Sequence, residues 1–193
     1  MRTLDAFFGH PRGVAGRAGG ALMVHGNAPQ ERWAVDHAGL RPGMTVVVIG
    51  PGPGVGLDLA AEAVAPSGHV IGVEPSAAMR RMAAERCVGH IAWRLLELRE
   101  GTAERTGCPD GSADTVISVN NVMMWDRPAG FREVHRVLRP GGRLVLTVHR
   151  HVLDVTPDRL GADAAAAGFV GIDRVSRPRR FTTPAVELIA VRP

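Results

Sequence analysis

The stretch TVVVIGPGPGVGL, from Thr45 to Leu57, decides the fold of this chain. Four consecutive apolar residues, Val46 to Ile49, leave no polar face for water, which is typical of a parallel strand buried on both sides. Three alternating glycines follow, and then a helical pattern begins. Because glycine lacks a Cβ atom, backbone amides at such a turn can approach a ligand at the start of the next helix. The stretch therefore predicts a nucleotide-like ligand, against the alternative of a glycine-rich turn that binds nothing.

The spacing of these glycines, together with the next acidic residue, indicates which kind of nucleotide-like ligand is expected. Gly50, Gly52 and Gly54 form a G-x-G-x-G pattern, whereas a dinucleotide site requires G-x-G-x-x-G. A second apolar strand, His69 to Val73, ends in Glu74. A carboxylate at the tip of the second strand can accept hydrogen bonds from both hydroxyls of a ribose. The alternative, an exposed loop glutamate, is less favoured because the polarity changes directly after an apolar run.

Three further segments complete a pattern that extends over most of the chain. They are EPSAAM, GTAERTGCPDGSADTVISVNN and HRVLRPGGRLVL, which begin at Glu74, Gly101 and His135. With the glycine turn they span roughly Thr45 to Val148, in the order found in class I S-adenosylmethionine-dependent methyltransferases of the small-molecule kind. The chain resembles this family. The resemblance implies S-adenosylmethionine as the cofactor, with S-adenosylhomocysteine as the product.

The resemblance also implies which residues hold the cofactor. It places the three glycines against the methionine part and its ribose, and Glu74 on the ribose hydroxyls. Other residues expected at the cofactor lie after the second, third and fourth strands, with residues 102–104 beside the adenine: Pro75, Met79, Thr102, Ala103, Glu104 and Asn120. Two positions depart from the family pattern, because Val48 and Thr102 stand where relatives commonly carry an acid.

Methyl transfer asks a protein mainly to align a nucleophile with a reactive sulfonium, so a base is needed only when the acceptor must lose a proton early. The candidate bases are His149, just past the fifth expected strand, and His25 in the N-terminal segment. Candidate acceptor-binding residues are Met123, Trp125, His10 and His151. Each histidine could instead be an ordinary surface residue, and Met123 and Trp125 could instead pack against the following helix. No metal ligands are expected.

The composition agrees with one ordinary domain of 193 residues. No apolar run is long enough to span a bilayer, and the N-terminus lacks the apolar stretch of a signal peptide, so we expect a cytoplasmic protein. Cys87 and Cys108 are expected to be free thiols. All 23 basic residues are arginine, which excludes Schiff-base lysine chemistry. One cluster could meet a phosphate or carboxylate, or could lie in a solvated loop: Arg174, Arg177, Arg179 and Arg180.

Alternating strand-like and helix-like segments predict an α/β fold with a doubly wound, Rossmann-like sheet of seven mostly parallel strands. The link between the last two strands is too short for a helical crossover, so these strands are expected to form an antiparallel hairpin. Residues 1–39 are expected to form an N-terminal helical lid, in which Asn27 caps a helix that ends at Gly39, and residues 44–193 a single core. The other expected strand bounds are Leu95–Arg99, Asp114–Val119, Arg143–Val148, Phe169–Val175 and Ala185–Val191.

The leading hypothesis is transfer of a methyl group from S-adenosylmethionine to an oxygen, nitrogen or carbon atom of a small molecule. An apolar acceptor body is expected because the N-terminal segment carries residues such as Phe7 and Phe8. The alternative is a cofactor-binding protein of this fold that does not methylate or that catalyses another reaction such as cyclisation. A nucleic-acid methyltransferase is less favoured, because the fourth strand ends in SVNNVMMW without the Asn/Asp-Pro-Pro-aromatic motif. The expected partner is a small-molecule acceptor, with no nucleic acid and no membrane span, and the oligomeric state stays open.

Overall fold

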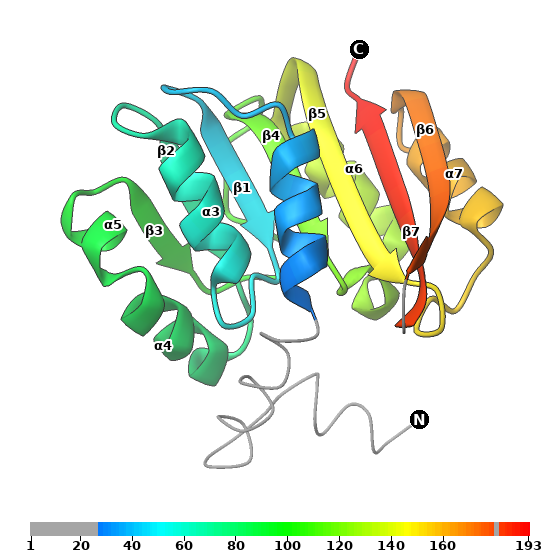
Figure 1. Ribbon diagram of the computed structural model, residues 1–193. Helices are drawn as coiled ribbons and strands as arrows, with labels where there is room; N and C mark the ends of the chain where they lie inside the picture. Colours follow the sequence, from blue (N-terminus) through cyan, green and yellow to red (C-terminus); the bar gives the residue numbers. More distant parts are fainter. Residues whose placement is uncertain (1–26, 180–181) are drawn as a thin grey trace.

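Figure 1 shows the computed structural model, which describes residues 27–179 and 182–193. Within these residues, seven strands form one sheet in the order β3-β2-β1-β4-β5-β7-β6. The first five strands are parallel, and β7 pairs antiparallel with both β5 and β6. The strands are β1 Thr45–Ile49, β2 His69–Val73, β3 Leu96–Arg99, β4 Ala113–Val119, β5 Leu138–His149, β6 Val170–Arg179 and β7 Thr182–Val191. The doubly wound sheet with a C-terminal antiparallel hairpin is therefore confirmed.

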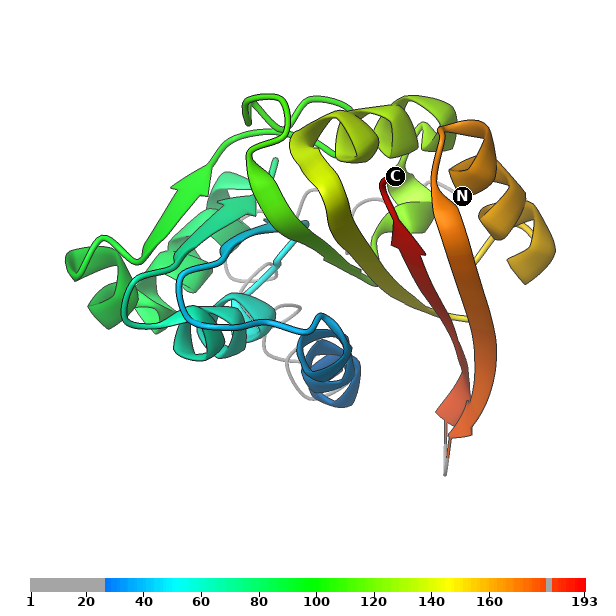
Figure 2. The same cartoon turned by 90° about the horizontal axis from the view of Figure 1, so that it is seen from above.

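Helices cover both faces of this sheet, as Figure 2 shows from above. One layer consists of a helix formed by residues 27–37, α3 (Val55–Val64), α4 (Ala77–Arg86) and α5 (Val88–Ala92). The other consists of α6 (Arg127–Val137), which follows the short 3-10 helix η2 (Val122–Met124), and α7 (Pro157–Ala166). The chain leaves β1 toward β2 and β3, and later returns to place β4 on the other side of β1. The edge between β1 and β4 is therefore the topological switch point, where open α/β sheets bind ligands.

Side chains of the central strand alternate between two hydrophobic clusters, one on each face of the sheet. Val47 and Ile49 belong to the cluster on the side of α6 and α7, and Val46 and Val48 to the cluster on the side of α3. All four are at most 3% exposed. The uninterrupted apolar run of β1 thus serves two layers, which explains why this strand has no polar face.

The helix of residues 27–37 packs on the sheet beside α3 and differs from the expectation at its start (Figure 1). Residue 27 is already helical, so Asn27 is not the cap, and its side chain bonds to Asn120 instead. The helix stops as predicted, because Gly39 adopts a positive φ of 65°. Ala34 and Ala38 are buried against the α3-side core, since small side chains let the helix approach the sheet. The expected lid before residue 27 lies outside the described residues.

The C-terminal strands are longer than the sequence predicted. β5 begins at Leu138 rather than Arg143, and its Pro-Gly-Gly sequence lies inside the strand, where the pairing with β4 is irregular. β6 runs on to residue 179, so Arg174 and Arg177 lie in a strand and not in a loop.

Ion pairs within the fold engage both of these strand arginines. Arg174 pairs with Asp158 at 3.1 Å, and Arg177 pairs with the buried Glu187 at 2.5 Å. The side chain of Arg179 and all of Arg180 lie outside the described part of the chain. The hypothesis of an anion-binding cluster therefore loses two of its four members.

Both cysteines are buried free thiols, as predicted. Burial, with the negative charge of Asp58 nearby, raises the pKa of the Cys87 thiol to about 12, so it stays protonated. In the part of the chain that the structure describes, no helix is long and apolar enough to cross a membrane.

Phe131 anchors the core between the sheet and α6. Its ring is fully buried and lies edge-to-face with Trp125 and Phe169, at centroid distances of 5.7 and 6.4 Å. We expect Phe131→Ala to lower the free energy of unfolding by about 3–5 kcal/mol, because it removes apolar contacts and leaves a cavity. Urea denaturation measures this change. The control Trp93→Ala, at a side chain 87% exposed, should change it by less than about 0.5 kcal/mol. Equal losses in the two variants would contradict the assignment of Phe131 to the core.

Candidate cofactor site and active site

The predicted site residues lie on loops that follow neighbouring parallel strands. The glycine turn follows β1, Glu74 follows β2, residues 102–104 follow β3, Asn120 follows β4, and His149 ends β5. Because these strands are parallel, all five loops leave the same edge of the sheet. The topology therefore gathers the predicted residues along one edge, around the switch point between β1 and β4.

Gly50 begins the glycine turn at a point where a side chain would collide with Asn121. It has a φ of +60°, and a Cβ atom there would overlap the side-chain amide of Asn121. That amide donates to the carbonyl of Ile49 at 2.6 Å. Asn121 Oδ1 in turn accepts hydrogen bonds from Ser118 Oγ at 2.7 Å and from Trp125 Nε1 at 2.9 Å. Asn121, which sequence reasoning passed over, thus fixes the path of the chain where β1 ends.

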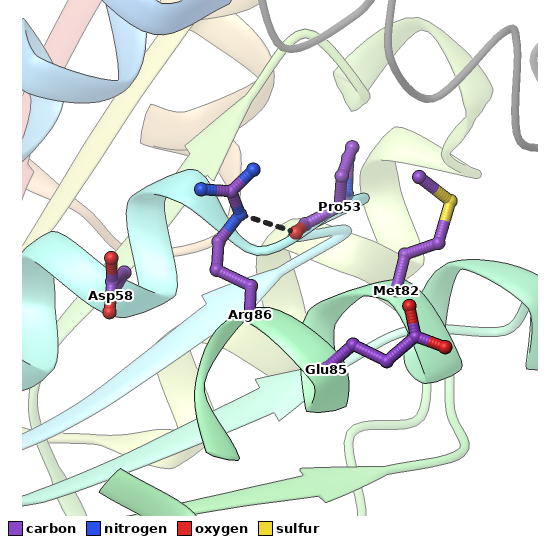
Figure 3. Close-up of a pocket in the computed structure, with 5 residues that line it drawn as sticks. All are labelled: Pro53, Asp58, Met82, Glu85 and Arg86. Carbon is purple, nitrogen blue, oxygen red and sulfur yellow. Dashed lines mark hydrogen bonds between the residues drawn. The ribbon is translucent and has the colours of Figure 1, made fainter. Parts of the chain in front are cut away.

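Gly54 closes the same turn against α4. Its φ is +90°, and a Cβ atom would lie only 2.9 Å from the Cα atom of Ala83. Arg86, at the end of α4, donates from Nε to Pro53 O at 3.0 Å (Figure 3). Cys87, the C-cap of α4, donates from Sγ to Gly54 O at 3.7 Å. Gly54 is the N-cap of α3 but has no side chain with which to cap it. First-turn N–H groups of α3 are therefore left to a ligand with acceptor atoms.

Glu74 is held in place beside this turn. Its side chain is 6% exposed, so the alternative of an exposed loop glutamate is wrong. Glu74 Oε2 accepts from Gly52 N at 3.2 Å, and Oε1 accepts from Ser76 N at 2.9 Å. Ser76 also caps α4, where its hydroxyl accepts from Met79 N. The neighbouring Pro75 presents its carbonyl to Arg80 at 2.9 Å. The carboxylate is thus oriented by backbone amides before any ligand arrives.

The predicted adenine loop forms a tight turn after β3. Thr102 and Arg105 exchange backbone hydrogen bonds of 3.1 and 3.2 Å. Ala103 is 4% exposed and belongs to the core on the α6 side. Glu104 Oε1 accepts from Asp126 N at 2.8 Å, which ties the turn to the start of α6. Glu104 therefore holds the loop in shape, while the backbone of residues 102–103 remains at the sheet edge.

Asn120 joins three segments at the end of β4, and it adopts a φ of +54°, which is uncommon for a residue other than glycine. Its Nδ2 atom donates to Asn27 Oδ1 at 2.9 Å and to Gln30 Oε1 at 2.6 Å. Its Oδ1 atom accepts from His149 N at 2.8 Å. The fully buried Gln30 also donates to Thr147 Oγ1 at 3.3 Å. The N-terminal helix is thereby fastened to β4 and β5 next to the predicted methionine site.

Sequence reasoning missed this network. A signal was present, because Gln30 continues the spacing of the small buried residues Ala34 and Ala38 along one face of the helix. A polar residue on a buried stripe needs a buried partner. Which partner it finds depends on the strands on which the helix packs.

The two described histidines among the site candidates stand together at the end of β5. The rings of His149 and His151 have centroids 5.4 Å apart, with His149 half-buried and His151 exposed. Their position at the sheet edge agrees with the prediction, and their roles as base and acceptor contact stay predictions. His10 and His25 lie outside the described residues.

For the residues after β4, the structure favours packing over an acceptor pocket. Trp125 is 9% exposed and lies against Gly130 of α6, where a Cβ atom would come within 2.8 Å of the indole ring. Met123 is partly buried against the same core. Met124, which the sequence did not single out, is 50% exposed beside them. Among the three residues of η2, Met124 is thus the exposed one.

A separate hollow lies between α3 and α4, and Figure 3 shows the residues that line it. Its volume is about 430 Å³. Its lining residues are Pro53, Asp58, Met82, Glu85 and Arg86. None of the predicted cofactor residues lines it. Beside it, Asp58, Glu62 and His90 bring ligand-type atoms within 4.8 Å of one another, and a hydrogen bond of 3.1 Å joins Asp58 and His90.

Glu31 is a buried acid on the N-terminal helix that the sequence did not single out. It is 7% exposed, and its carboxyl oxygen lies where a Cβ atom of Gly56, in the first turn of α3, would be. Burial raises the pKa of the Glu31 carboxyl from 4.5 to about 8. At neutral pH the ligand-free protein therefore holds this side chain mainly in its neutral form.

The raised pKa of Glu31 predicts how stability depends on pH. The folded protein holds this proton more tightly than the unfolded chain, so its contribution is complete below pH 4.5 and is lost as the pH rises through about 8. Ligand-free wild type should therefore lose stability relative to Glu31→Gln between pH 5.5 and 8.5. Urea unfolding at several pH values measures the difference. The exposed control Glu100→Gln should follow wild type throughout, and parallel curves for wild type and Glu31→Gln would contradict the burial of this acid.

Gly50 and Gly107 allow a matched test of the turn. Both have positive φ angles, +60° and +70°, but a Cβ atom at Gly107 meets nothing within 4 Å. Gly107→Ala should cost about 1–2 kcal/mol from backbone strain alone. Gly50→Ala should cost about 1–3 kcal/mol more, because it must also displace Asn121. Equilibrium unfolding measures the loss of stability in each variant. Equal losses would show that the Asn121 side chain moves aside without an energetic cost.

Comparisons with known proteins place the chain among relatives of known family. The family described as "Methyltransferase domain" matches residues 47–146. The uncharacterized methyltransferase YdaC of Bacillus subtilis is 30% identical over 162 residues, which cover 80% of this chain and 87% of that protein. The ubiquinone/menaquinone biosynthesis C-methyltransferase UbiE of Hahella chejuensis is 33% identical over 119 residues, 60% of this chain and 47% of UbiE.

A solved structure shows the same fold with the cofactor bound. Phosphoethanolamine N-methyltransferase 2 of Haemonchus contortus, in complex with S-adenosyl-L-methionine, has a TM-score of 0.75 at 18% identity, covering 86% of this chain and 52% of that one. This chain therefore spans about half the length of that protein and of UbiE. The matched family and the Bacillus relative together decide the assignment: the chain belongs to the class I S-adenosylmethionine-dependent methyltransferases.

Proposed function

We propose that this methyltransferase acts on an oxygen, nitrogen or carbon atom of a small molecule with an apolar body. The observation that carries the cofactor part of this proposal is the oriented carboxylate of Glu74 beside a glycine turn that opens the uncapped helix α3. Two of the similar proteins bear the names of small-molecule methyltransferases, which supports this acceptor class. After β4 the chain continues Asn-Asn-Val-Met, which lacks the motif of nucleic-acid amine methyltransferases.

The residues present suit each part of the cofactor. Glu74 offers two acceptor oxygens to the ribose hydroxyls, and the glycine turn lets the methionine part approach the backbone. The turn of residues 102–103 borders the adenine, where Thr102 supplies no acid and backbone groups take its place. Asn120 fastens the N-terminal helix beside the methionine part. When bound, the cofactor supplies an electrophilic methyl group, and the chain's own task is to align the acceptor with it.

On the acceptor side, we place His149 and His151 next to the reacting atom. His149 is fixed through its backbone N–H, which donates to Asn120, so its ring stands at the edge shared with the cofactor site. A neutral imidazole there can take a proton from an acceptor hydroxyl or amine. The exposed side chain of Met124 adds an apolar contact for the acceptor body. His25 and His10 complete the proposed set.

Binding and turnover must be measured on the same protein to test this function. Calorimetry should show saturable binding of S-adenosylmethionine and S-adenosylhomocysteine, with no comparable affinity for NAD. Release of S-adenosylhomocysteine with a panel of small apolar alcohols, amines and phenols then reports methylation. Binding without any turnover would favour the alternative of a non-methylating protein, and preferential NAD binding would contradict the cofactor placement.

Glu74→Gln should weaken S-adenosylmethionine binding by at least about tenfold, because charge-assisted hydrogen bonds are worth about 1.5–3 kcal/mol each. The substitution keeps the side-chain volume, and the thermal midpoint checks that the variant is folded. Glu85→Gln is the matched control, since Glu85 lies beside the glycine turn but lines the separate hollow. If Glu85→Gln lost affinity and Glu74→Gln did not, the cofactor would sit between α3 and α4 instead.

A further inference from the structure

Glu31 brings a carboxyl group from the N-terminal helix to the first turn of α3. On one face of the N-terminal helix, Asn27 and Gln30 contact the network at the end of β4, while Ala34 contacts the apolar core. Glu31 lies between these two regions and points to Gly56, two residues after the last glycine of the turn. The substitution Gly56→Ala would remove the space that this carboxyl occupies. The helix therefore delivers an acid to the first turn of α3.

This carboxyl has no partner within residues 27–179 and 182–193, where no donor or cation bonds to it. The charged residues on the packed elements are engaged elsewhere: Asp58 pairs with His90, and Arg143 donates to His37 O at the far end of the helix. Glu62 on α3 and Arg32, Asp36 and His37 on the same helix do not contribute to its pKa, which burial alone raises. Glu74, across the turn, accepts from backbone amides.

A buried acid without a partner costs stability, and such groups concentrate at functional sites. A cation with hydrogen-bond donors would offset this loss of stability, because such a ligand stabilises the ionised carboxylate. The strand offers no acid at this end, since Val48 is buried in the apolar core that also holds Ala34.

We propose that Glu31 is the counter-charge for the ammonium group of the cofactor's methionine part. This inference rests on the proposed placement of that part at the glycine turn. The ammonium has N–H donors, whereas the sulfonium has none, so the ammonium is the better partner for a carboxylate. When the ligand binds at neutral pH, the Glu31 carboxyl releases its proton to solvent and forms the ion pair. Glu31 thereby makes up for the acid missing from β1.

The test compares wild type with Glu31→Gln in calorimetric titrations of S-adenosylmethionine and S-adenosylhomocysteine, both of which carry the ammonium. At pH 7, titrations in buffers of different ionisation enthalpy should show release of about one proton by wild type and markedly less by the variant. At pH 8.5 the variant should bind both ligands about tenfold more weakly, and at pH 6 the gap should nearly close. At pH 7 the ligand's own amine is already mostly protonated, so it adds only a small proton uptake to either titration.

Glu62→Gln serves as control, because Glu62 is an exposed acid on the neighbouring α3. It should bind and release protons like wild type. The inference is overturned if Glu31→Gln behaves like wild type, or if its loss of affinity is confined to S-adenosylmethionine, which would indicate the sulfonium. If the variant does not fold, wild type alone decides: release of about one proton supports the inference, and release of none overturns it. If wild type bound neither ligand, the proposed cofactor placement would fail, whatever Glu31 does.

Discussion

The constraint on which the rest of the site depends is the close approach of the Asn121 amide to the backbone of Gly50. Asn121 belongs to the loop after β4, and Gly50 ends β1, so this contact locks the two sides of the switch point together. The side chains of Ser118 and Trp125 donate hydrogen bonds to the side-chain oxygen of Asn121, which connects the turn to the core around α6. Glycine is required at position 50 because of the neighbouring Asn121 side chain as well as because of its positive φ.

The turn is also fixed from α4 and from β2. Ala83 leaves no space for a side chain at Gly54, and Arg86 holds the carbonyl of Pro53. Glu74 accepts the amide of Gly52 from the other direction. Contacts on three sides already hold this loop in one conformation, so ligand binding does not have to order it. The conformational-entropy cost of binding is therefore smaller. The same contacts explain why the carboxylate of Glu74 faces inward.

The N-terminal helix adds polar groups that the Rossmann-like sheet does not contain. Its buried face changes along its length, from Asn27, Gln30 and Glu31 near the site to Ala34 and Ala38 at the far end. The amides find partners in Asn120 and Thr147, whereas the carboxyl of Glu31 has no hydrogen-bond partner among the described residues and lies beside Gly56 of α3. An apolar face would have packed the helix at lower cost. The polar end therefore indicates a role at the site, and the helix is part of the site and not only a cover.

The sequence by itself determined the parallel sheet, the glycine turn, the acid after β2 and the terminal hairpin, because each depends on local patterns: apolar runs, glycine spacing and short connections. It did not reveal Asn121 as the partner of Gly50, Gln30 and Asn27 as partners of Asn120, or Glu31 as a buried acid. It also placed Trp125 in an acceptor pocket as readily as in the core. These relations join residues distant in the chain, and only the packing of the helix and strands decided them. The physical reason is that hydrogen-bond partners and burial follow from which surfaces meet, whereas periodicity records only which residues share a face.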